Sequence, residues 1–76
     1  MRDRRKIRAR EIQLTDERLE LDEHIDELID FLDKQEVRQT VNGDYLAAEK
    51  IRYMLMMSYR AALTTLINRL KGREEL

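Results

Sequence analysis

Residues 45–70, YLAAEKIRYMLMMSYRAALTTLINRL, carry apolar side chains on more than one face of a helix. At their centre, residues 53–57 (YMLMM) form an almost uninterrupted apolar run. A helix that is apolar on two faces needs two neighbours to cover them. We expect one neighbour to be the preceding helix of the same chain and the other to belong to a second copy.

The two expected faces of this helix differ in their residues. The main face is predicted to hold Ala48, Ile51, Leu55, Ala62, Leu63, Leu66 and Leu70, with Tyr59 at its rim. The second face is predicted to hold Ala47, Met54, Met57 and Ala61. Methionine side chains adapt to irregular surfaces. We therefore predict a protein interface formed by Tyr53, Met54, Met57 and Ala61.

Residues 14–34, LTDERLELDEHIDELIDFLDK, carry one narrow apolar stripe in an acidic background. The stripe is a heptad seam made of Ile7, Leu14, Leu21 and Leu28, with Ile25 and Leu32 between them. Its upstream intermediate positions are polar: Arg4, Glu11 and Arg18. Either one helix runs from about residue 3 to 38, or a short arm precedes a helix that starts at residue 16. No helix breaker lies between them, which favours the continuous helix.

The chain contains no proline and only two glycines, so few residues can interrupt or end a helix. Asn42-Gly43 predicts positive φ in a hairpin loop, and Asp44 is expected to cap the second helix. Gly72 is expected to end that helix. The predicted segments are a basic arm or helix extension (1–13), an acidic amphipathic helix (14–38), a loop (39–44), a two-faced apolar helix (45–71) and a tail (72–76).

A chain of 76 residues without cysteine is a single small domain with no disulfide to stabilise it. We therefore predict an all-α fold, a two-helix antiparallel hairpin that self-associates into a four-helix bundle-like dimer or a higher oligomer. The N-terminus lacks the apolar segment of a signal peptide, and no apolar run is long enough to span a membrane. A cytoplasmic location is expected.

Charge is distributed unevenly along the chain. Residues 1–10 have a net charge of +5, residues 11–36 of −9 and residues 37–76 of +3. An acidic helix beside a basic one is consistent with an antiparallel pair. Such pairs select register and partner more than they add stability.

Catalytic chemistry has little support in the sequence. The single histidine, His24, shares a helix face with Glu20 and Glu27, but three residues along one face rarely converge on one ion. We expect it to be a solvated surface residue, and we expect no metal and no cofactor. No nucleophile stands beside a base, so the protein is predicted not to be an enzyme.

Two groups of cations are suited to binding anions. The basic N-terminus offers a polyanion contact through Arg2, Arg4, Arg5, Lys6, Arg8 and Arg10. In the second helix, a small anionic ligand would be held by Arg52, Tyr59, Arg60 and Arg69. The structural alternatives are a solvated arm and arginines that pair with the acidic helix.

The stretch RLELDEHIDELIDFLD (18–33), followed by MMSYRAALTTLINRL (56–70), resembles small helical-hairpin accessory proteins of tailed bacteriophages. The residues that carry the resemblance are Leu28, Phe31, Leu32, Met56, Tyr59, Leu63, Arg69 and Leu70. In outline the chain is also similar to phage hairpin proteins that sequester cyclic-nucleotide or cyclic ADP-ribose immune signals. That similarity implies an oligomer with ligand pockets between chains, in the cytoplasm of an infected bacterium.

These observations lead to three functional hypotheses. The first is a non-enzymatic phage-type accessory or counter-defence protein that binds a host or phage protein through an oligomeric hairpin. The second is a sponge that sequesters an anionic nucleotide signal. The third is a nucleic-acid binder that uses the basic arm.

Overall fold

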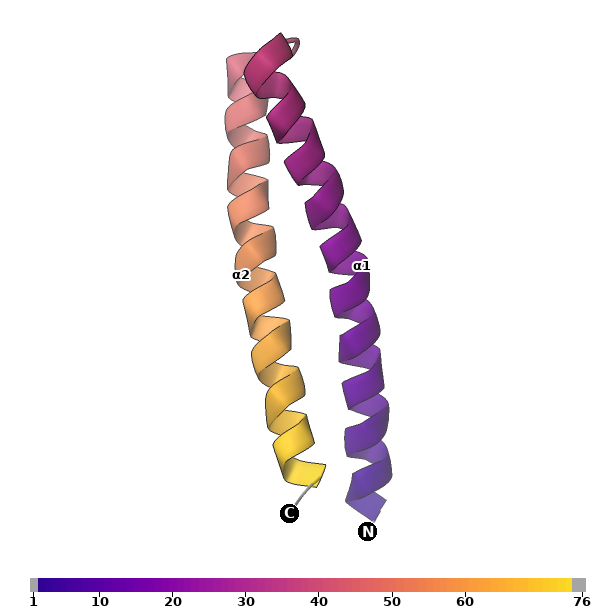
Figure 1. Cartoon of the computed structure of the whole chain (residues 1–76). Helices are drawn as coiled ribbons and strands as arrows, with labels where there is room; N and C mark the ends of the chain where they lie inside the picture. The colour runs from indigo at the N-terminus through magenta and orange to yellow at the C-terminus, as the bar shows by residue number, and fades with distance from the viewer. Residues whose placement is uncertain (1, 75–76) are drawn as a thin grey trace.

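The computed structural model describes residues 2–74, with side chains for residues 4–72. Helix α1 spans Arg2–Arg38 and helix α2 spans Gly43–Glu74. The two helices lie side by side in opposite directions, so the start of α1 and the end of α2 lie at the same end of the hairpin (Figure 1). The hairpin measures 56 × 15 × 14 Å. The predicted all-α hairpin is confirmed, and of the two alternatives for the first helix the structure has the continuous one.

The seam of α1 forms half of the interior. Leu14, Leu21, Ile25 and Leu28 are all buried, as the heptad spacing predicts. The seam also holds polar residues. The Glu11 side chain is buried, and its Oε2 accepts no hydrogen bond from the described residues. The Arg8 guanidinium lies 3.9 Å from this oxygen, within range of an ion pair. Arg18 reaches across to α2, where its Nη1 donates to Thr64 Oγ1 at 3.4 Å.

The face of α2 that packs on α1 is not the predicted main face. Leu63 and Ile67 are buried, and the partly buried residues packed against the core cluster are Tyr53, Met56 and Leu70. These five residues follow the 3-, 4- and 7-residue spacing of a heptad seam. Of the predicted main face, Leu63 and Leu70 lie in the seam. The expectation was wrong for the other five, which are exposed: Ala48, Ala62, Ile51, Leu55 and Leu66. The exposed fractions of Ile51, Leu55 and Leu66 are 58%, 65% and 46%.

A buried glutamine fixes the turn between the helices. Gln35 Oε1 accepts hydrogen bonds from the backbone N–H groups of Thr40 (2.9 Å) and Val41 (3.2 Å). Its Nε2 donates to Thr40 Oγ1 at 2.9 Å. Gln35 is only 6% exposed, so its amide group is itself buried and finds its partners in the loop.

The turn chemistry differs from the prediction at three positions. The residue with positive φ is Gln39 (φ 48°), directly after α1, and neither Gly43 nor Gly72 has positive φ. Asn42 caps α2, because its Oδ1 accepts from the Asp44 N–H at 2.7 Å. Asp44 therefore lies inside the first turn, where its charge complements the helix dipole. Gly72 does not end α2, which continues to Glu74.

Candidate functional site

The outer face of α2 is the side of the helix that points away from α1. In the seven-residue repeat set by the seam, Ile51, Ser58 and Thr65 lie opposite α1. The residues that flank this line are Ala47, Ala48, Met54, Leu55, Ala61, Ala62, Asn68 and Arg69. We call these eleven residues the outer face. Every one of them is exposed.

The outer face is unusual because it carries no charge from Ala47 to Asn68, about 32 Å along the helix. Met54 and Leu55 are each 65% exposed. The corresponding side of α1 is acidic, with Asp16, Glu23 and Asp30 all exposed. An extended uncharged surface with large apolar side chains is typical of a protein contact.

The hairpin exposes more surface than a compact protein of its mass. Its accessible area is 6353 Å², whereas a compact monomer of 9.2 kDa exposes about 4,900 Å². The difference, about 1,400 Å², exceeds the roughly 800 Å² that each partner buries in a standard protein interface. The surface available for association is therefore ample.

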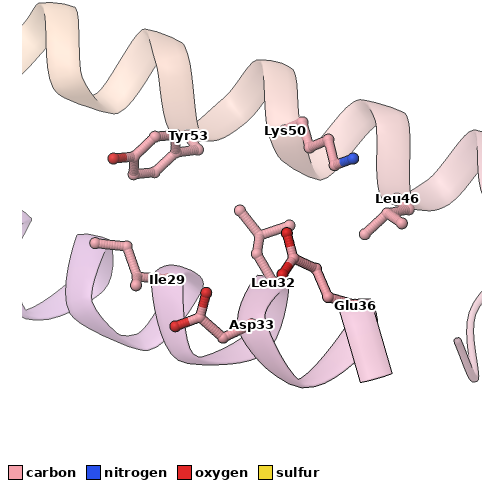
Figure 2. A pocket seen from close by; sticks show the side chains of 7 residues that line it. All are labelled: Ile29, Leu32, Asp33, Glu36, Leu46, Lys50 and Tyr53. Atoms are coloured by element: carbon pink, nitrogen blue, oxygen red, sulfur yellow. The ribbon is translucent and has the colours of Figure 1, made fainter. Parts of the chain in front are cut away.

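A hollow of about 260 Å³ lies between the helices near the turn. Figure 2 shows Leu32 and Tyr53 between the two helices, Asp33 and Glu36 on α1, and Lys50 on α2. With two carboxylates against one ammonium group, the lining has a negative charge balance. This hollow does not suit an anionic ligand.

The four residues predicted to hold an anionic ligand do not converge in one chain. The Arg60 guanidinium pairs with Asp22 on α1, and Arg52 Nη1 lies 3.2 Å from Glu49 Oε1. A hydrogen bond from the Tyr59 hydroxyl to the Glu17 carboxylate raises the pKa of Tyr59, with smaller contributions from desolvation and the Glu17 charge. Arg69 lies ten residues beyond Tyr59, about 15 Å along the helix. A shared ligand site would therefore require groups from a second copy.

The four residues of the predicted protein interface fall on different sides of α2. Met54 and Ala61 belong to the outer face. Met57, which is 36% exposed, lies at the flank between the outer face and the seam. Tyr53 packs against the core cluster instead. Its ring also lines the hollow shown in Figure 2.

The N-terminal cations lie beside the C-terminal cations of α2. The antiparallel arrangement brings both ends of the described chain together (Figure 1). Arg8 and Lys71 line one hollow there, and Arg10 and Arg69 line another. Arg4, Arg5 and Lys6 are exposed in the first turns of α1, and the side chain of Arg2 lies outside those described. We call this region the basic end.

His24 is exposed on α1, as expected for a surface residue. Among the described residues, no group of three or more His, Cys, Asp or Glu side chains is arranged to hold a metal ion. Within the same part of the chain, neither helix is long and apolar enough to cross a membrane.

Two structurally important residues were missed in the sequence. Gln35 continues the seam of α1 at the spacing of Leu28 and Leu32, so its burial could have been read from the heptad. Asn42 has a side chain suited to capping and directly precedes α2. The following Gly43 makes the same asparagine equally typical of a turn.

Comparison of the chain with protein-family models, curated proteins and solved structures gave no match.

Proposed function

We propose that this protein is a non-enzymatic binding module whose hairpins self-associate through the outer face of α2 and then bind another protein. The observation that carries the proposal is the outer face, which carries no charge from Ala47 to Asn68 and on which Ile51, Met54 and Leu55 are more than half exposed. Fully burying a side chain of this size stabilises a complex by about 1.5–3 kcal/mol. The resemblance of residues 18–70 to phage accessory hairpins supports a host or phage protein as the further partner.

The size of the core supports the same proposal. The buried apolar residues of the hairpin are Leu14, Leu21, Ile25, Leu28, Leu63 and Ile67. Chains of this length rarely gain enough stability from such a core and are commonly supported by oligomerisation. Covering the outer face would add a second apolar contact along most of α2.

Sedimentation velocity over a wide range of protein concentration tests the proposal. Wild type is expected to sediment as an oligomer that dissociates on dilution. Leu55→Asp places a charge in the outer face and should give a folded monomer. Leu19→Asp is the matched control, because Leu19 is 55% exposed on α1, and it should leave the oligomer intact. A monomeric wild type, or equal effects of the two substitutions, would refute the proposal.

The basic end supports a second candidate function, binding to a polyanion such as nucleic acid. The observation in its favour is the juxtaposition of the exposed N-terminal cations with Arg69 and Lys71. Cations that contact phosphates release counterions, so affinity for a short DNA duplex would fall steeply with salt. Reversing Arg4, Arg5 and Arg69 to glutamate should abolish that binding. Arg38→Glu at the opposite end of α1 is the control and should have little effect.

A further inference from the structure

Between Ile51 and Thr65, the two halves of the outer face differ in side-chain size. Large side chains, Ile51, Met54 and Leu55, occupy the half nearer the turn. Small ones, Ala61, Ala62 and Thr65, occupy the half nearer the basic end. Ser58 lies midway between Ile51 and Thr65. The central part of the face, from Ile51 to Thr65, is therefore a row of projections followed by a row of shallow depressions, with a small residue at its midpoint.

We infer that a second copy of this chain docks on the outer face with its α2 antiparallel, related by a two-fold axis at Ser58. This inference rests on the proposed function, which requires self-association but leaves the direction of the second helix open. In the antiparallel register Ile51 meets Thr65 of the second copy, Met54 meets Ala61 and Leu55 meets Ala62. Ser58 meets its own counterpart.

Close packing explains why this direction is preferred. Antiparallel pairing places each large side chain over a small one, so the two helices approach evenly along the whole face. Parallel pairing would place Met54 and Leu55 against their own counterparts and leave voids between Ala61 and Ala62. Overpacking at one end and cavities at the other both oppose association. A two-fold interface also uses the same surface of both chains, which the outer face satisfies.

The charges beside the outer face are compatible with this register. Lys50 and Arg52 lie at its two edges, near the turn. In the antiparallel register they come opposite Thr64 and Leu66 of the second copy, so neither Lys50 nor Arg52 lies directly opposite a like charge. A parallel two-fold pair would bring opposite edges together, so Lys50 would lie beside Arg52 of the second copy, which is unfavourable.

The inferred dimer has a definite shape. Because the outer face points away from α1, the four helices form a row, with the two copies of α2 in the centre and α1 at each edge. Because the two hairpins run in opposite directions, the basic end of one copy and the basic end of the other lie at opposite tips of the helices. This differs from the bundle-like dimer that the sequence suggests.

Single cysteines test the register cleanly, since the chain has none of its own. Ser58→Cys is expected to form a disulfide-linked dimer under mild oxidation, because the two sulfur atoms meet at the two-fold axis. Ile51→Cys and Thr65→Cys should each fail to cross-link alone. In the antiparallel register residue 51 and its counterpart are separated by about 21 Å along the helices. A mixture of these two variants should give the mixed disulfide.

The outcomes separate the inference from the proposed function. Cross-linking of Ser58→Cys, and of Ile51→Cys only with Thr65→Cys, supports the antiparallel dimer. Cross-linking of all three single variants indicates a parallel pair and overturns the inference, while self-association stands. An oligomer in sedimentation without any of these cross-links also overturns it, because another surface is then used. A monomeric wild type overturns both.

Discussion

The Arg60 guanidinium on α2 forms an ion pair with the Asp22 carboxylate on α1, and this contact joins the middles of the two helices. Arg60 occupies a seam position between Met56 and Leu63, where a charged head group must leave the interior to reach water. Asp22 meets it at the edge of the seam. The Asp22 carboxylate therefore compensates the positive charge of Arg60 in the middle of the interface, and the pair fits only one register of the two helices.

The Arg60–Asp22 pair is expected to contribute little to stability. The two side chains are 47% and 32% exposed, so solvent screens their attraction. A double-mutant cycle with Arg60→Ala and Asp22→Ala, followed by urea unfolding, should give a coupling free energy of about 0.2–1 kcal/mol. A coupling of several kcal/mol would show that the pair is desolvated in solution.

Gln35→Ala should destabilise the hairpin much more than an exposed glutamine substitution. It removes the acceptor for the part-buried hydrogen bonds of the Thr40 and Val41 N–H groups, and each such bond contributes about 0.5–1.5 kcal/mol net. Gln13→Ala is the control, because Gln13 is exposed on α1. Equal midpoints of thermal unfolding for the two variants would contradict the role given to Gln35.

Leu63→Ala and Leu55→Ala should affect stability in different ways. Leu63 is 1% exposed, so its truncation should lower the free energy of unfolding by about 2–5 kcal/mol at any protein concentration. Leu55 contacts only the second copy in the proposed assembly. Its truncation should reduce only the part of the stability that rises with concentration. Thermal unfolding at low and high concentration distinguishes the two, and a concentration-independent loss in Leu55→Ala would count against the outer face.

The pKa of Tyr59 should fall towards its ordinary value of 10.0 in Glu17→Gln. In wild type the hydrogen bond to the Glu17 carboxylate favours the neutral phenol and raises that pKa. The associated stability is therefore present below pH 10 and is lost as the pH rises through the raised pKa. NMR titration of the Tyr59 ring resonance measures the shift. An unchanged pKa in Glu17→Gln would remove this contact as its cause.

The sequence predicts α1 well and α2 poorly, for a physical reason. The first helix has a single apolar stripe, so the heptad spacing of Leu14, Leu21 and Leu28 identifies its buried face. The second helix has apolar residues at nearly every position between Tyr53 and Met57. Periodicity then cannot say which of its faces meets α1.

The candidate site shows the same division. That α2 has a surplus apolar surface follows from the sequence, which also places Met54 and Ala61 on it. That Tyr53 packs inward and Leu55 faces outward does not follow, because both fit an apolar helix face equally well. Only part of the basic end could be predicted from the sequence. The cations of residues 4–10 are neighbours in the chain, whereas Arg69 and Lys71 join them only through the antiparallel packing of the helices.

The sequence by itself determined the two helices, the acidic and apolar character of each, and the position of the turn, because these depend on local composition and spacing. Only the tertiary structure decided how α2 is rotated about its axis. That rotation depends on long-range contacts, in which Leu63 and Ile67 fit between the α1 seam residues and Arg60 reaches Asp22. Once it is set, the residues left outside are Ile51, Met54 and Leu55, and they define the surface through which this chain is proposed to act.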